Sequence, residues 1–306
     1  MIQQFDSLMQ MMEAFPDEQT CIDHLRAIRW QHGPYCPLCG STKVYHFSDK
    51  RTHKCGDCRQ RFSIKVGTIF EDTKLPLRKW FIAIWLITSH KKGIASAQLA
   101  RDLKITQKSA WFLLHRLRYA ARSQSFAAPL EGDVEVDETY VGGKNKNRHR
   151  DKRTAGTGSA GKSIVIGAVA RGGSVIAKVV PGLDTEAMED FVDGAVSSAP
   201  GKVTSLSTDE HSGYRRLGAK YPHGVVRHAS GEYVSGIIHT QTIDGYWSQL
   251  KRQIIGIHHW VSAKHLDRYV AESSWRYNRR ESGEGARVNA LLSDATGRLT
   301  YKALIR

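Results

Sequence analysis

The sequence lacks any apolar run of the roughly 18 residues that a membrane-spanning helix requires. Its longest candidate, FIAIWLI at 81–87, is flanked by charged and polar residues. The first fifteen residues lack the basic start and apolar stretch that mark a secretory signal. From these absences we expect a cytoplasmic protein without a membrane partner.

Acidic residues are scarce relative to basic ones. The 306 residues include 30 Asp and Glu against 45 Lys and Arg, a formal net charge of +15. Such a surplus indicates an anionic partner, most often nucleic acid. Because the basic residues occur in blocks, we favour nucleic acid over a merely solvated basic surface. The hydrophobic fraction of 41% excludes wholesale disorder, and the length suits two or three domains.

Cysteines are few: all five fall within the first sixty residues, and four of them form the pairs CPLC and CGDC. Two C-x-x-C pairs about fifteen residues apart have the spacing of a zinc ribbon. Two disulfides are the alternative, which a cytosolic location disfavours. We predict one structural Zn²⁺, because four thiolates leave no open position. The expected ligands are Cys36, Cys39, Cys55 and Cys58.

Helical periodicity begins near residue 75. The segments SAQLARDL and QKSAWFLLHRLRYAAR are separated by a short turn at Lys104-Ile105, an arrangement typical of a helix-turn-helix. The turn lacks the usual glycine, and a plain helical bundle is the alternative. If the segment contacts DNA, the available side chains are Lys108, His115, Arg116, Arg118 and Arg122.

Carboxylates cluster in GDVEVDETYVGGK, where a protein this basic has least reason to gather them. Asp133, Glu135 and Asp137 alternate with valines, so a strand would present all three on one face. Like charges repel at this spacing, and holding a divalent cation is the natural use. The alternative for Glu135 and Glu138 is an ion pair with a lysine.

The elements after this strand follow a recognisable order. Two further strands at 163–170 and 174–180 are joined by RGG, an amphipathic helix covers 185–199, and a fourth strand ends at Asp209. This is the order of an RNase-H-like fold, in which the first and fourth strands are neighbours. We therefore predict a mixed α/β (α+β) protein.

A helix is expected at HTQTIDGYWSQLKRQIIG. Asp244, Ser248 and Lys251 share one face of it. Asp137, Asp209 and Asp244 could then meet around two Mg²⁺ (or Mn²⁺) ions roughly 3.5–4 Å apart, the arrangement that catalyses phosphoryl transfer. The alternative for Asp209 and Asp244 is helix capping.

Several of these runs together resemble a known family. VEVDETYVGGK, STDEHSGYRRL, HTQTIDGYWSQLKR and YVAESSWRYNRR, with CPLCG and HKCGDCRQRFSIKVGTIFEDTKLPL before them, are similar to DDE-type insertion-sequence transposases of the ISXO-like group. The resemblance extends from about Phe15 to Arg280. The expected domains are an N-terminal helical segment at 1–30, a zinc ribbon at 31–70, a helix-turn-helix-like segment at 75–125, an RNase-H-like DDE catalytic domain at 130–285 and a C-terminal tail at 286–306.

The resemblance also implies roles for individual residues. Asp137 and Asp209 match the first two metal-binding aspartates, and Lys251 matches a basic residue that contacts DNA phosphate. Asp244 occupies the place usually held by glutamate, whose side chain is one methylene longer. Gln241, where many relatives have asparagine, is the alternative third ligand.

The eight residues GTGSAGKS at 156–163 match the phosphate-binding pattern G-x-x-x-x-G-K-[ST]. That pattern needs a strand before it and a helix after it. Here a basic, polar run precedes it and the β-branched SIVIGAVA follows, so we expect no nucleotide binding. The basic run, including Lys144, and Arg252 are instead expected to contact the DNA backbone.

The sequence thus predicts a nucleoid-associated DNA transposase. It would bind the terminal inverted repeats of its insertion sequence as double-stranded DNA, then cleave and transfer strands in a metal-dependent reaction. A homo-oligomer is expected on DNA, because two ends must be paired. The alternative is a catalytically inert zinc-ribbon regulator derived from a transposase, which would have no reason to keep the three aspartates.

Overall fold

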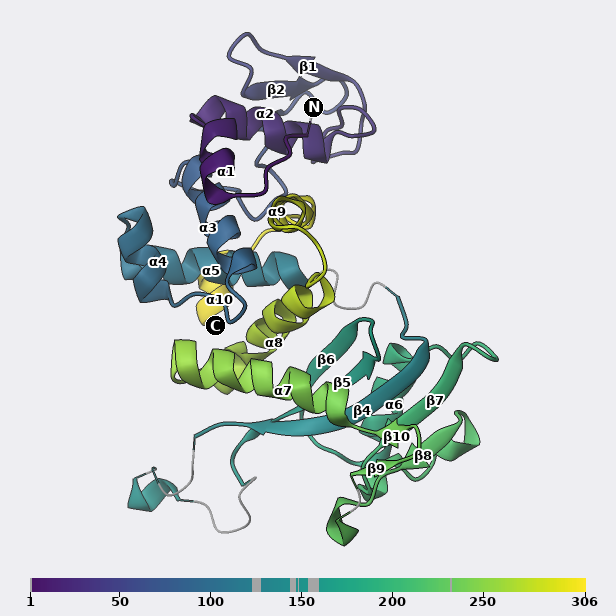
Figure 1. Cartoon of the computed structure of the whole chain (residues 1–306). Helices are drawn as coiled ribbons and strands as arrows, with labels where there is room; N and C mark the ends of the chain where they lie inside the picture. Colours follow the sequence, from purple (N-terminus) through teal and green to yellow (C-terminus); the bar gives the residue numbers. More distant parts are fainter. Residues whose placement is uncertain (1, 123–127, 144–146, 148, 154–159, 232) are drawn as a thin grey trace. The chain divides into compact units, whose positions relative to one another are not determined.

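The chain folds into two compact units. The computed structural model describes residues 2–122, 128–143, 147, 149–153, 160–231 and 233–306. One unit comprises Met1–Ser123 together with Glu281–Arg306, and the other comprises Gln124–Arg280 (Figure 1). Lys144 and the first half of the GTGSAGKS run lie outside the described residues, and with them the predictions made there. Lys162, the lysine of that run, is followed directly by a strand.

The first unit is built around helix α3 (Leu77–Ser89), which is apolar on most of its circumference. Helices α1 (Leu8–Ala14), α2 (Glu18–Arg29) and α9 (Glu284–Ser293) belong to the same unit. Phe15 packs edge-on against Phe81 at 4.9 Å between ring centroids. The zinc-ribbon segment adds a small antiparallel sheet of β1 (Val44–His46), β2 (Thr52–Cys55) and β3 (Arg61–Ser63).

The two helices of the expected helix-turn-helix are present as α4 (Ser96–Leu103) and α5 (Gln107–Arg122). Lys104 adopts a left-handed conformation with φ 48°, taking the position where a glycine is usual. The Ile105 amide donates to the Ala100 carbonyl at 3.0 Å, and the Thr106 hydroxyl accepts from the Ser109 amide at 3.2 Å. A local turn therefore fixes the angle between the helices.

Residues 286–306 are not a tail. They contain most of α9 and the short helix α10 (Tyr301–Ile305), and they complete the core of the first unit. Thr296 bridges Thr68, and the Ile69 amide donates to the Ala295 carbonyl at 3.1 Å. The buried apolar side chains of this stretch include Val288, Leu291, Leu292, Leu299 and Leu304.

The second unit contains a five-stranded mixed sheet in the order β6-β5-β4-β7-β8. Strand β4 pairs antiparallel with β5 and parallel with β7, which confirms the predicted neighbourhood of the first and fourth strands. This is the RNase-H-like strand order. The strands are β4 (Gly132–Val141), β5 (Ser163–Ala170), β6 (Val175–Val180), β7 (Val203–Thr208) and β8 (His223–Val225).

Helices cover both faces of this sheet (Figure 1). On one face, α6 (Thr185–Ala195) packs on Val134 and Val136 of β4. On the other, α7 (Gln241–Gln253) and α8 (Ala263–Asn278) enclose a second core. The short strands β9 (Val234–Ser235) and β10 (Ile238–His239) precede α7. Among the described helices, none combines the length and apolarity needed to cross a membrane.

Candidate functional site

The four predicted cysteines lie together in the first unit. The Sγ atoms of Cys36 and Cys58 are 3.7 Å apart, and those of Cys39 and Cys55 are 3.6 Å apart. Tetrahedral coordination with Zn–S bonds of about 2.3 Å separates sulfurs by about 3.8 Å. All four are free thiols that could hold one ion. The spacing therefore fits a zinc site and not two disulfides.

Two tight turns aim these thiols inward. Gly40 and Arg59 each follow a C-x-x-C pair with positive φ, 78° and 59° respectively. Gly56 has a different role, because its amide donates to the Lys43 carbonyl at 2.7 Å and a Cβ would lie 3.1 Å from the Lys43 Cβ. The approach of the two knuckles thus depends on a glycine at position 56.

An acidic group lies at the end of the β4–β7 ladder in the second unit. Asp137 and Glu138 on β4 and Asp209 just after β7 have carboxylate oxygens within 4.8 Å of one another. The parallel ladder ends at the pair Glu135 and Ser207, while β4 continues beyond it. Asp209 therefore turns into the space that the shorter strand leaves beside β4.

Burial and mutual repulsion make this group electrostatically strained. The pKa of Asp137 is raised to about 7. Desolvation by burial is the largest cause, followed by the charge of Glu138 and, more weakly, by those of Asp209 and Asp244. The Trp247 Nε1–H donates to Asp137 Oδ2 at 2.8 Å and partly opposes this rise. Burial and Asp209 also raise the pKa of Glu138. A divalent cation would relieve the repulsion.

The third carboxylate of the group differs from the expected one. Glu138, for which an ion pair with a lysine was the alternative, accepts a hydrogen bond from the Tyr214 hydroxyl at 3.0 Å. Asp244 lies exposed in the first turn of α7, near enough to influence Asp137 but outside the group of three. Gln241, also exposed, is the first residue of that helix.

A glycine lets α7 approach the strand that carries Asp137. Gly167 on β5 is the cross-strand partner of Asp137. A Cβ at this position would lie 2.7 Å from Trp247 Cη2, closer than such contacts allow. The indole can therefore pack directly on β5 and reach the carboxylate. This close packing holds the aspartate in one orientation.

Glu135 is a buried anchor for α7 and does not belong to the group formed by Asp137, Glu138 and Asp209. Its carboxylate accepts from the Thr242 and Ile243 amides at 2.8 and 3.0 Å and from the Thr242 hydroxyl at 2.9 Å. Arg171 Nε donates to it at 2.7 Å, and His239 Nδ1 lies 3.1 Å away. Free amides and a positive dipole at a helix N-terminus favour a carboxylate there. Glu135 thus joins α7 to β4.

Replacing Glu135 by glutamine is expected to destabilise the second unit by about 3 kcal/mol, because the Arg171 charge would stay partly buried without its partner. Thermal or urea unfolding measures this loss. The matched control is Glu131→Gln, whose carboxylate forms an exposed pair with Lys202. That control should change stability by less than about 0.5 kcal/mol. Equal effects of the two substitutions would contradict the anchoring role.

The expected DNA contacts on α7 are exposed. Lys251 and Arg252 lie in its last turn. Lys108, near the start of α5, is also exposed, and its ammonium lies 4.8 Å from the centre of the Tyr301 ring. These three cations are accessible to a phosphate backbone.

Arg116 is not accessible, which contradicts its prediction as a DNA contact. It is 6% exposed, and its guanidinium donates to the carbonyls of Leu299, Ile69 and Glu71 at 2.9–3.1 Å. His115 and Arg118 on the same helix are buried as well. The face of α5 that carries these side chains packs inside the unit, so Arg116 joins the C-terminal segment to the segment before α3.

The strand order and the acidic group where the β4–β7 ladder ends define an RNase-H-like protein with a candidate metal site, preceded by a four-cysteine ribbon. Residues 129–278 match the ISXO2-like transposase domain, and residues 16–61 match the transposase zinc-ribbon domain. The chain belongs to the ISXO2-like transposases of insertion sequences with an N-terminal zinc ribbon.

A relative from a mobile element is similar over most of its length. It is an uncharacterized protein in transposable element ISH50 of Halobacterium salinarum, 28% identical over 273 residues, covering 85% of this chain and 90% of the relative. A solved structure of a pre-cleavage Mos1 transpososome matches 74% of this chain and 82% of its own, with 12% identity and a TM-score of 0.28.

Proposed function

We propose that this transposase binds the ends of its insertion sequence as double-stranded DNA and cleaves and transfers DNA strands at the acidic group. The observation that carries the proposal is the convergence of Asp137, Glu138 and Asp209 where the ladder between the parallel strands β4 and β7 ends. Two protomers would be needed to hold two ends together, so we expect a homo-oligomer on DNA.

The donor set suits a hard divalent cation. Carboxylate oxygens are the ligands that Mg²⁺ and Mn²⁺ prefer, and the raised pKa values of Asp137 and Glu138 reflect carboxylates without a neutralising partner. Two such ions, when bound, activate the attacking oxygen and stabilise the leaving oxygen in phosphoryl transfer.

The protein's own residues position the acidic group and the DNA. Trp247 and Tyr214 fix Asp137 and Glu138 through hydrogen bonds of 2.8 and 3.0 Å. Glu135 holds the N-terminus of α7 against β4. Lys251, two helical turns beyond Asp244, is placed to bind a backbone phosphate.

The cysteine group is proposed to hold one structural Zn²⁺. Four thiolates close the coordination shell, so the ion would stabilise the ribbon and take no part in chemistry. Together with α4 and α5, the ribbon would contribute to recognition of the transposon ends. Among the expected contacts, Lys108, Lys251 and Arg252 remain proposals, as does Lys144.

The test is nicking and joining of the DNA that flanks the gene, in Mg²⁺ or Mn²⁺, by the intact protein. Wild-type cleavage that requires the metal supports the enzyme. Tight binding of the same DNA without cleavage would instead indicate the inert regulator.

Three variants, tested in the same cleavage assay, identify which residue is the third metal ligand beside Asp137 and Asp209. We expect Asp244→Ala and Glu138→Gln each to lower cleavage, with about a hundredfold loss for the residue that binds metal. Gln241→Ala is expected to cost less than about tenfold if a carboxylate completes the shell. A larger loss in Gln241→Ala than in both acid variants would transfer the role to the amide.

A further inference from the structure

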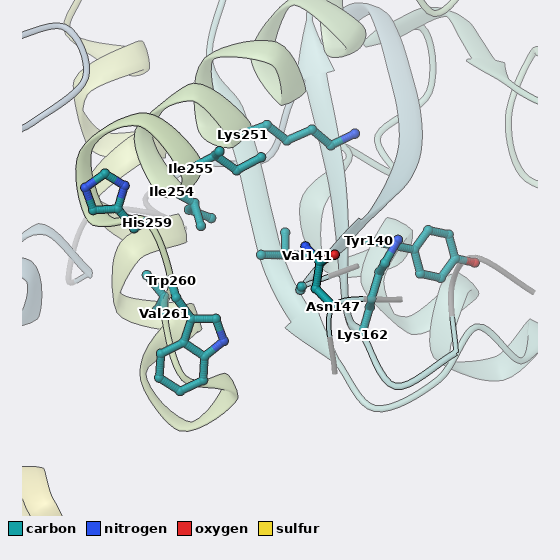
Figure 2. A pocket seen from close by; sticks show the side chains of 12 residues that line it. Tyr140, Val141, Asn147, Lys162, Lys251, Ile254, Ile255, His259, Trp260 and Val261 are labelled. Carbon is teal, nitrogen blue, oxygen red and sulfur yellow. The ribbon is translucent and has the colours of Figure 1, made fainter. Parts of the chain in front are cut away.

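A hollow of about 660 Å³ opens on the second unit between the end of β4 and the chain that follows α7. This volume lies in the range of roughly 300–1,000 Å³ typical of small-molecule sites. Figure 2 shows Trp260 and Val261 on one side of it, Tyr140 and Lys162 on the other, and Lys251 extending from α7.

Two large apolar side chains at the hollow remain in water. Trp260 is 68% exposed and Ile255 is 66% exposed. Because burial of apolar surface is favourable, a partner that covered these two side chains would gain binding free energy. Val141 and Ile254 also line the hollow and are buried, so the exposed pair extends an existing core to the surface.

The backbone that presents Trp260 is irregular. Residues Ile254–His258 form a single π-helical turn, and His259 adopts a positive φ of 59°. The Trp260 amide then donates to the His258 carbonyl at 2.6 Å. Such turns and strained residues occur frequently at functional sites. The local fold thus holds an indole outward at the mouth of the hollow.

Two cations face the same space. Lys162 precedes β5, and Lys251 comes from α7. Within the described part of the chain, neither ammonium forms an ion pair or a side-chain hydrogen bond. An exposed aromatic ring and free ammonium groups that line one hollow are the combination that stacks a nucleobase and holds its adjoining phosphates.

The hollow lies close to the acidic group along two elements. Val141 is four residues beyond Asp137 on β4, a distance of about 13 Å. Lys251 is seven residues beyond Asp244 on α7, about 10 Å along the helix. With a rise of about 3.4 Å per nucleotide in duplex DNA, these distances correspond to about three or four nucleotides.

We propose that this hollow binds one unstacked nucleotide of the DNA substrate, with its base on Trp260 and its phosphates on Lys162 and Lys251, about three or four nucleotides from the point of cleavage. This inference rests on the proposed function, since it takes the transposon end as the substrate. Its consequence is that a base must leave the duplex when the end is bound.

Binding measurements with mismatched duplexes test the proposal. Extruding a base costs less where it is already mispaired. In the Asp137→Asn background, without cleavage, dissociation constants are measured for duplexes of the flanking DNA with one mismatch moved along the end. We expect a mismatch at one position to tighten binding about tenfold. That preference should vanish in Trp260→Ala and persist in Trp260→Phe.

The matched control is Ile237→Ala, an exposed apolar residue outside the hollow, which should retain the preference. No preferred mismatch position, or a Trp260→Ala variant that weakens all duplexes equally, would overturn the proposal. So would a change in the sedimentation mass of DNA-free protein in Trp260→Ala, since the hollow would then bind another copy. If the wild-type protein did not cleave the DNA but still showed the mismatch preference, only the proposed catalysis would be refuted.

Discussion

The Asp137→Asn variant is expected to lose metal-dependent DNA cleavage by about a thousandfold or more while binding the same DNA as tightly as wild type. The side chain lies at the centre of the acidic group, and loss of a ligand charge removes several kcal/mol of transition-state stabilisation. A gel assay of nicking under single-turnover conditions measures the rate, and filter binding measures the affinity.

Stability distinguishes this loss from misfolding. Burial and neighbouring carboxylates raise the pKa of Asp137 to about 7, so its ionised form destabilises the metal-free fold at higher pH. Asparagine can still accept from Trp247. The melting temperature of Asp137→Asn at about pH 8 in chelator should therefore equal or exceed that of wild type. A lower value would mean that the variant fails for structural reasons.

Asp133→Asn is the matched control for this experiment. Asp133 lies on the same strand, but it accepts a hydrogen bond from Ser205 at 2.7 Å and is not part of the acidic group. It should cleave DNA at a rate within about threefold of wild type. If both variants lost activity equally, the strand and not the acidic group would account for the effect.

Removal of zinc is expected to unfold the ribbon while the helices of the same unit persist. Structural zinc binding in small finger peptides contributes about 10–16 kcal/mol. The buried apolar cluster of this ribbon is small and consists of Phe62, Cys36 and Cys55, with a few partly buried side chains packed against it. We expect chelation, or Cys36→Ser, to expose residues 31–66 to protease and to release one equivalent of zinc. Metal analysis and limited proteolysis measure both.

Cys21→Ala is the control for the zinc experiment. Cys21 is buried in α2, away from the four ligands, and burial raises its pKa to about 12. The variant should keep one zinc per chain, and its melting temperature reports the cost of the lost packing separately. A ribbon that resists protease without metal would contradict a structural role for the ion.

The features that could be predicted from the sequence are those that depend on the spacing of nearby residues or on the order of the elements. The four-cysteine group follows from two C-x-x-C pairs, and the helices α4 and α5 follow from local periodicity. The neighbourhood of Asp137 and Asp209 required only the order of strands, because the fold places the first and fourth strands together. These features depend on spacing along the chain.

The features that could not be predicted from the sequence depend on where strands end and on which helix faces pack inside the protein. Alternation places Glu138 on the face opposite Asp137, so period two argues against it as a partner. Only the early end of the β4–β7 ladder brings both near Asp209. Arg116 looked like a surface cation because its partner Leu299 lies 183 residues away. The helices after residue 284 gave no sequence signal of their own.

The first unit is built from two segments that are separated along the chain by the whole second unit, and this affects the order in which the units can fold during synthesis. Its core needs Glu281–Arg306, which follow the second unit along the chain, whereas the ribbon and α5 precede that unit. Gly285 packs so tightly on Phe5 that a Cβ would lie 1.9 Å from the Phe5 carbonyl oxygen. A nascent chain that ends before residue 281 therefore carries an incomplete first unit, together with a second unit whose residues are all present. The first unit can therefore be completed only after the second unit has been made.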